Sequence, residues 1–282
     1  MSRPTLGVLG YIYQGVAYDI PFVESVKSVI DVVDEFVLCE CYSTDGTWEL
    51  CQQLKSEYPD KLKLIRRPWV SHFVEISALA NFVYDHVTTD YVMELQSDEV
   101  VHERDLEKIA KLPEVMQQQN KTAARWNYLH FLNTETTFPF CYSSLIRVVK
   151  TSAPWRIIGD GVQFAINGSQ TPEEKIYNTD IEVFHYGKMK DPEKGFNKEV
   201  SFQDLFKSVG FPDPKMAEMK NKIGERCDYL YLFRDHVVNK TITKFLGTHP
   251  AVMAQRLAEF KSKGFDQFIS EMEANLKIDA GL

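Results

Sequence analysis

Two acidic residues stand directly after a short apolar stretch of this chain. Asp98 and Glu99 follow residues 91–95, Tyr-Val-Met-Glu-Leu. Carboxylates so placed can bind Mg²⁺ or Mn²⁺, an ion that takes its other ligands from water and substrate phosphates. His185 ends a second apolar stretch, residues 181–184, and an imidazole ligand would favour Mn²⁺ over Mg²⁺. The sequence therefore predicts a divalent metal site, and the alternative for His185 is an ordinary structural histidine.

The two common glycine-rich motifs that bind phosphate are missing from the sequence. Gly7, Gly10 and Gly15 lack the G-x-G-x-x-G spacing of dinucleotide-binding loops, and no P-loop motif occurs. No lysine or arginine lies between Arg3 and Lys27, where a nucleotidylyltransferase would need basic residues for a triphosphate. Phosphate charge must therefore be met elsewhere, and a metal ion is the obvious means.

Composition limits the remaining function classes. The 282 residues are 44% hydrophobic and 26% charged, as in ordinary globular proteins, and the net charge of -8 disfavours binding to nucleic acid. No apolar stretch approaches the roughly 20 residues that span a membrane, and the first residues do not resemble a signal peptide. Five cysteines without a C-x-x-C pair are typical of reduced thiols. We therefore expect a cytoplasmic protein without a membrane span.

Hydrophobic patterning predicts an α/β fold. In the first hundred residues, short apolar runs alternate with segments of helical period, which is typical of βαβ units around a parallel sheet. The predicted strands are residues 6–13, 36–40, 62–66 and 91–95. Ligands of such sheets bind outside the carboxyl ends of the strands. The residues to inspect there are Tyr11 to Gln14, Glu40 and Asp45, Arg66 and Arg67, and Asp98 and Glu99.

The second half of the chain has longer, aromatic-rich apolar stretches, at residues 123–132, 144–149 and 181–186, and these favour a mixed or antiparallel arrangement. A lysine-rich segment of helical period follows Pro192. We predict one α/β domain at 1–200, with its two halves at 1–110 and 111–200. A helical C-terminal extension is predicted at 201–282.

Three segments carry a family resemblance. Residues 37–47, V-L-C-E-C-Y-S-T-D-G-T, resemble the V-V-D-x-G-S-x-D-G-T motif of family-2-type glycosyltransferases. Residues 96–103, Q-S-D-E-V-V-H-E, are similar to the Q-A-D-E-V-L-H-E metal motif of a bacterial subgroup. Residues 185–194, H-Y-G-K-M-K-D-P-E-K, resemble a downstream H-Y-G-x-x-R-D-P-x-K stretch of related sequences. The three segments stand in the order expected of that family.

This resemblance implies an A-type glycosyltransferase fold, with a Rossmann-like nucleotide-binding half and a mixed sheet. Such a fold binds a nucleoside-diphosphate sugar, most often a UDP-sugar, with Mn²⁺ or Mg²⁺. Residues 1–200 would then be the catalytic domain, with the nucleotide-sugar-binding half at 1–110 and the acceptor half at 111–200. Glu40 falls where the family's acidic residue contacts the base or ribose, and Asp45 where a loop aspartate supports the nucleotide. Asp98 matches the principal metal ligand and His185 the histidine that completes the site. The remaining residues expected around the donor are Tyr11, Tyr13, Arg67, Gln96 and Ser97.

Two departures from the family pattern bear on function. Glu40 is one methylene longer than the usual aspartate, and Gln96 replaces the first acidic residue of the metal motif. The loss at Gln96 motivates an alternative function, a non-catalytic nucleotide-sugar-binding or scaffold protein. A nucleotidylyltransferase, which would release pyrophosphate, is a further alternative.

An inverting transfer to a carbohydrate or other acceptor hydroxyl also needs a carboxylate base. Asp160 is the candidate, with an ordinary Gly-Asp-Gly turn as its alternative interpretation. Glu99 is the reserve base, and its alternative is to fix a loop or the metal surroundings. Lysines 188, 190, 194 and 198 either line the donor phosphates or form a solvated helix face.

Overall fold

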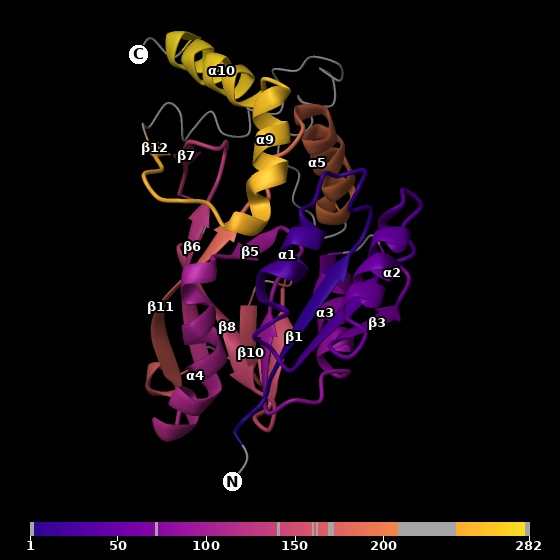
Figure 1. The fold of residues 1–282 in the computed structure, drawn as a ribbon, viewed down its shortest axis with the longest axis vertical. Coiled ribbons are helices and arrows are strands. Elements are labelled where there is room, and N and C mark those ends of the chain that lie inside the picture. Colours follow the sequence, from indigo (N-terminus) through magenta and orange to yellow (C-terminus); the bar gives the residue numbers. More distant parts are fainter. Residues whose placement is uncertain are drawn as a thin grey trace.

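A mixed eight-stranded sheet forms the centre of the molecule (Figure 1). The computed structural model describes residues 3–70, 73–139, 142–159, 161, 163–168, 172–207 and 241–279. The strand order is β3-β2-β1-β4-β8-β6-β11-β5. The first four neighbours in this order run parallel: β3 (Leu62–Arg66), β2 (Glu35–Glu40), β1 (Leu6–Ile12) and β4 (Tyr91–Glu94).

The other half of the sheet mixes strand directions. Its strands are β8 (Ser144–Lys150), β6 (Ala123–His130), β11 (Ile176–His185) and β5 (Glu99–Val101). β8 runs antiparallel to both β4 and β6, β11 runs parallel to β6, and β5 is antiparallel to β11. The α/β prediction is confirmed, and a parallel half joined to a mixed half is the arrangement that the resemblance implied.

The two faces of the sheet are covered by different elements because side chains alternate along each strand. Val8 and Leu38 pack in one cluster with the helices α1 (Phe22–Val29), α2 (Thr47–Glu57) and α4 (Leu106–Gln118). Leu9 and Val37 face the other way, towards α3 (Phe73–Tyr84) and the hairpin of β9 (Trp155–Ile158) and β10 (Gln163–Ile166). The carboxyl ends of the strands therefore emerge between two packed layers.

The C-terminal elements lie at the end of the sheet opposite the N terminus (Figure 1). They comprise α5 (Pro192–Lys207), β12 (Thr243–Lys244), which pairs with β7 (Thr136–Thr137), η3 (Ala251–Met253), α9 (Ala254–Ser262) and α10 (Phe265–Asp279). Two further single turns are η1 (Glu103–Asp105) and η2 (Glu173–Lys175). Among the described residues, none of the helices is both long and apolar enough to cross a bilayer.

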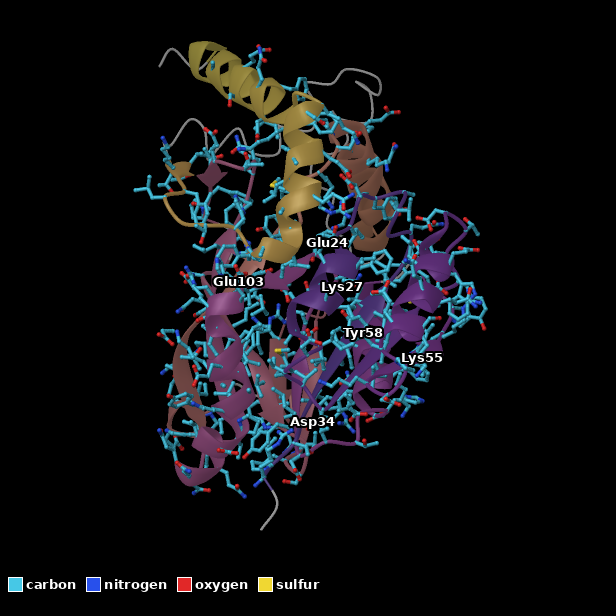
Figure 2. All side chains as sticks on the ribbon, in the orientation of Figure 1. Glu24, Lys27, Asp34, Lys55, Tyr58 and Glu103 are labelled. Atoms are coloured by element: carbon cyan, nitrogen blue, oxygen red, sulfur yellow. The ribbon has the colours of Figure 1, made fainter. Side chains whose placement is uncertain are left out.

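Ion pairs and apolar contacts attach α9 to the rest of the described structure. Glu24 and Glu103 lie below the C-terminal helices (Figure 2); Arg256 of α9 binds Glu24 and Asp19, and the amide of Ala251 donates to Glu103. Buried residues of η3, α9 and α10 share a cluster with strand-end aromatics: Met253, Phe260, Ile269, Phe131, Phe184 and Tyr186. The segment η3–α9–α10 is thus packed against the ends of the strands.

Several local features differ from the sequence-based expectation. The three-residue strand β5 and the β9–β10 hairpin were not predicted, because short strands leave little periodic signal. Helix α4, for which no prediction was made, contains Pro113 and continues to Gln118, and its Ile109 and Met116 are buried in the core. The predicted divisions at 110/111 and 200/201 fall inside α4 and α5 and stay predictions.

A buried ion cluster lies beneath residues 96–103, which contain the predicted metal motif and are called the metal-motif loop below. Arg147 of β8 is fully buried and donates to Glu94 at 2.8 Å and to Glu99 at 2.7 Å. The hydroxyl of Tyr128 also donates to Glu99, at 2.8 Å. The second oxygen of Glu99 accepts the amide of Gln96 at 2.9 Å. The cluster thereby joins β4, β5, β6 and β8 and fixes the start of the metal-motif loop.

Glu94 is the incompletely paired member of this cluster. Its Oε1 atom is buried and has no hydrogen-bond partner among the residues that the structure describes. Burial raises the pKa of Glu94 to about 8, although Arg147 and the hydrogen bonds oppose the shift. The folded chain therefore holds a proton on Glu94 at neutral pH, and the charge of Arg147 is matched mainly by Glu99.

This proton predicts a pH-dependent stability. Glu94 loses its proton near pH 4.5 when exposed and near pH 8 when folded, so the wild-type free energy of unfolding falls as the pH rises through this interval. Glu94→Gln keeps an amide in place of the neutral acid and lacks this loss. We would measure the free energy of unfolding by urea titration at about pH 5.5 and about pH 7.5. The value for Glu94→Gln minus that for the wild type should be larger at the higher pH, by at least about 1 kcal/mol. Glu107→Gln, at an exposed position of α4, should show no such drift. A pH-independent difference for Glu94→Gln would contradict the assignment.

Candidate metal and nucleotide-sugar site

Asp98 and His185 lie together at the carboxyl edge of the sheet. Asp98 lies in the turn between β4 and β5, and His185 is the last residue of β11. These parts meet because β11 pairs with β5 so that His185 lies opposite Glu99, and the amide of Tyr186 donates to the carbonyl of Asp98 at 2.8 Å. Nε2 of His185 is 3.7 Å from Oδ1 of Asp98. The sequence prediction that these two side chains converge agrees with this geometry.

The pair fits the requirements of a divalent cation. A separation of 3.7 Å is longer than a hydrogen bond and shorter than twice a metal–ligand bond of about 2.1 Å, so one ion can contact both atoms. Among the described residues, no group of three or more His, Cys, Asp or Glu side chains is arranged to hold a metal. Two protein ligands suit Mg²⁺ or Mn²⁺, which retain positions for phosphate oxygens and water.

A lysine ammonium faces the other oxygen of Asp98. Lys198 of α5 donates from Nζ to Oδ2 of Asp98 at 3.1 Å, and both side chains are 13% exposed. Burial would raise the pKa of Asp98, but the ammonium groups of Lys198 and Lys190 and the hydrogen bond from Lys198 hold that pKa below its usual range. Asp98 is therefore ionised and already attracts positive charge.

Lysines of this segment point inward. Lys190 is 1% exposed and donates to the carbonyl of Tyr18, and Lys194 donates to the carbonyl of Val16. Together with Lys198 they bring positive charge to the loop after β1 and to Asp98. The solvated-face interpretation is therefore wrong for these three lysines.

A second histidine supports His185. Nδ1 of His130, the last residue of β6, is 2.9 Å from Nδ1 of His185, and Nε2 of His130 is 3.0 Å from the carbonyl oxygen of Tyr142. Burial lowers the pKa of His130 to about 4 and that of His185 to about 3. Both imidazoles are therefore neutral at pH 7, the form in which a histidine can bind a metal.

The loops after β1 and β2 are joined through Asp45. Its carboxylate accepts the amide of Ala17 at 2.6 Å and both the amide and hydroxyl of Thr47. The hydroxyl oxygen of Ser43 accepts the amide of Gln14 at 2.9 Å. Burial would raise the pKa of Asp45, but the hydrogen bonds from Thr47 and Ala17 hold that pKa below its usual range. Asp45 thus shapes the loop pair in which a nucleotide was predicted to lie.

Glu40 is enclosed rather than offered at the surface. It is fully buried, and one carboxylate oxygen accepts the amide of Ser43 at 2.6 Å while the other binds Arg66 at 2.7 Å. The guanidinium of Arg66 lies 4.0 Å from the ring centroids of both Tyr42 and Trp48. In this arrangement Glu40 holds the loop and Arg66, and the predicted contact with a base or ribose stays a prediction.

The other predicted donor residues surround the same loops. Tyr13 stacks on Trp69 with a centroid distance of 5.1 Å and an angle of 4°. The carbonyl of Tyr11 accepts the hydroxyl of Ser97, which ties the end of β1 to the metal motif. Arg67 instead binds Glu75 and the carbonyl of Ala78 on α3, as expected of a structural pairing.

The candidate bases differ in their surroundings. Asp160 lies outside the described residues, although Nε2 of Gln96 donates to the carbonyl of its neighbour Gly161 at 3.2 Å. Glu99 is fully buried, and both of its oxygens accept hydrogen bonds from the cluster around Arg147. This enclosure favours the alternative in which Glu99 fixes the loop.

Sequence reasoning did not identify His130 or Arg147 as parts of the site. His130 ends an apolar stretch as His185 does, and this shared position was the available signal. Arg147 gave none, because one arginine within an apolar strand does not show which carboxylates lie opposite it.

Comparison with known proteins supports the sequence motifs in part of the chain. Residues 21–123 match the family model for Glycosyl transferase family 2. A relative from Bacillus subtilis (strain 168), "Putative glycosyltransferase EpsE", is 31% identical over 107 residues. That alignment covers 38% of this chain and 37% of the relative.

Solved structures show only a distant likeness. The first 349 residues of S. aureus TarS give a TM-score of 0.42 at 11% identity, covering 98% of this chain and 90% of TarS 1–349. Glucosyl-3-phosphoglycerate synthase from Mycobacterium tuberculosis, in complex with Mn²⁺, UDP-glucose and phosphoglyceric acid, gives 0.44 at 14% identity, covering 74% and 81%. Likeness at this level supports no conclusion about activity.

The tight packing at Gly187 gives a test of the site geometry. A methyl group there would lie 2.6 Å from the His185 ring and 3.0 Å from Oδ2 of Asp98. We expect Gly187→Ala to displace the imidazole, to shift its NMR signals in the metal-free protein and to lower the free energy of unfolding by about 1–3 kcal/mol. Gly46→Ala is the control, because its methyl meets no atom within 4 Å and its cost comes from a φ of 93°. Unchanged His185 signals in Gly187→Ala would refute this geometry.

Proposed function

We propose that this chain is a metal-dependent glycosyltransferase that moves a sugar from a nucleoside-diphosphate sugar, with UDP as the first choice, to an acceptor hydroxyl. The observation that carries the proposal is the approach of Asp98 and His185 to 3.7 Å at the carboxyl edge of the sheet. The family-2 match to residues 21–123 supports it, because that segment contains both Asp45 and Asp98.

Asp98 and His185 would hold Mn²⁺ or Mg²⁺. When bound, such an ion neutralises negative charge on the departing diphosphate, an effect worth several kcal/mol. Asp98 supplies an ionised oxygen, and His185 supplies a neutral nitrogen. Lys194 and Lys198 add positive charge from α5, beside the loop after β1 and beside Asp98.

The nucleotide would occupy the joined loops after β1 and β2. Asp45 and Ser43 hold these loops together, and Tyr13 with Trp69 offers aromatic surface beside them. Glu40 contributes by keeping the second loop in place through Ser43. Tyr11, Gln96 and Ser97 connect this region to the metal motif.

We propose Asp160 as the base of an inverting transfer. Gly161, its neighbour in the sequence, accepts a hydrogen bond from Gln96, two residues before the proposed metal ligand, and this contact supports the proposal. A base there would accept the proton of the acceptor hydroxyl as that oxygen attacks the anomeric carbon and the diphosphate leaves. Glu99 would support the loop instead.

The remaining finer proposals concern surroundings. Cys39, Cys41 and Cys51 are buried free thiols, which favours the reducing cytoplasm. The acceptor would be a carbohydrate or another molecule with a free hydroxyl, and the net charge of -8 argues against nucleic acid.

One observation favours a second candidate, a nucleotide-sugar-binding protein without catalysis. Gln96 replaces the acidic residue expected at the start of the metal motif, and its side-chain amide is bound to Gly161. Calorimetry separates the two functions, because donor binding with neither transfer nor hydrolysis would favour the binder.

The test of the enzyme is nucleotide release from a panel of nucleotide sugars with and without Mn²⁺. We expect nucleotide release to require the metal. Asp98→Asn and His185→Ala should each lower the rate of release by about 100-fold or more, because each removes a ligand of the metal ion whose charge stabilises the leaving group. His86→Ala is the matched control, since His86 binds a backbone carbonyl of α3 away from Asp98. Release that is insensitive to chelator and to both site variants would contradict the proposal.

A further inference from the structure

A chain of hydrogen bonds leads from a backbone carbonyl to the nitrogen of His185 that faces Asp98. We propose that His130 is a positioning residue that holds the proton of His185 on Nδ1 and so presents Nε2 to a divalent cation. This inference rests on the proposed function, and it adds a role for a residue that neither the motifs nor the family match identified.

The strand register brings the two histidines together. β6 and β11 run parallel with His130 opposite His185, so both rings extend from the same face at the ends of neighbouring strands. Their Nδ1 atoms are 2.9 Å apart. A contact this short between two nitrogens requires a proton on one and a lone pair on the other.

The carbonyl oxygen of Tyr142 decides which nitrogen carries the proton. It can only accept, so Nε2 of His130, at 3.0 Å, must be its donor. A neutral His130 then has its lone pair on Nδ1, and the donor across the 2.9 Å contact is Nδ1 of His185. With its proton on Nδ1, the imidazole of His185 can bind a metal through the lone pair of Nε2, which lies 3.7 Å from Oδ1 of Asp98.

The ring of His130 is held in this orientation by its neighbours. Tyr128 stacks on it at 5.4 Å and 18°, and Tyr142 packs edge-on at 5.1 Å. The hydroxyl of Tyr128 belongs to the buried cluster of Glu99 and Arg147. Rotation of the His130 ring would therefore break its stacking with Tyr128 and its edge contact with Tyr142.

Without His130, the proton of His185 would no longer be held on Nδ1. The nitrogen that binds a metal is set by the hydrogen bond of the other nitrogen, and losing such a partner typically lowers metal affinity about 10- to 100-fold. Asp98 does not replace the partner, because its Oδ1, 3.7 Å from Nε2 of His185, favours a proton on that nitrogen instead.

The test uses two variants of His130. His130→Phe keeps an aromatic ring without nitrogen atoms, and His130→Asn keeps an acceptor near the position of Nδ1. We expect ¹⁵N NMR of the metal-free wild type to show the His185 proton on Nδ1, and His130→Phe to give a mixture of tautomers. Titration with Mn²⁺ in the presence of UDP, followed by electron paramagnetic resonance, should show about a 10- to 100-fold loss for His130→Phe and partial recovery for His130→Asn.

Epistasis separates positioning from general damage. In a His185→Ala background, His130→Phe should cause no further loss of Mn²⁺ affinity, whereas an independent loss would overturn the proposal. A His185 proton on Nε2 in the wild type would overturn it as well, whatever the variants do. Absence of nucleotide release with the proton on Nδ1 would contradict the proposed function and leave the tautomer assignment supported.

Discussion

A buried carboxylate at the carboxyl edge of the sheet needs positive charge beside it, and Asp98 is that carboxylate. Its two oxygens face different partners, the ammonium of Lys198 and the imidazole of His185. Helix α5 supplies this charge at the edge of the sheet. Lys198 contacts Asp98, and Lys194 contacts the loop after β1. The negative charge of Asp98 also makes the gap between Asp98 and His185 suitable for a divalent cation.

The structure below Asp98 gives this arrangement its rigidity. Arg147 joins Glu94 and Glu99, Glu99 holds the start of the metal-motif loop, and Tyr128 connects this cluster to His130. A buried ion pair is not in itself evidence of stability. Here its value is geometric, because it fixes strands on both sides of the site in one register. The unpaired oxygen of Glu94 is the cost of that arrangement.

Much of the fold could be predicted because short apolar runs and helical periods are local signals. The convergence of Asp98 and His185 was expected from the order of three motifs, and both lie at strand ends where ligands of such sheets bind. His130 was missed because its importance depends on the register of β6 against β11, which one sequence does not contain. Glu40 shows another limit: the residue is at the expected position, but its longer side chain reaches the amide of Ser43 and is enclosed. The inward lysines were also ambiguous, since a helical period does not show which face meets a buried carboxylate.

The most direct measurement is anomalous X-ray scattering from crystals grown with Mn²⁺ and UDP. The account predicts one strong manganese peak within bonding distance of both Oδ1 of Asp98 and Nε2 of His185, with UDP beside the joined loops after β1 and β2. A manganese peak elsewhere, with Asp98 still bound to Lys198 and His185 contacting no metal, would contradict it.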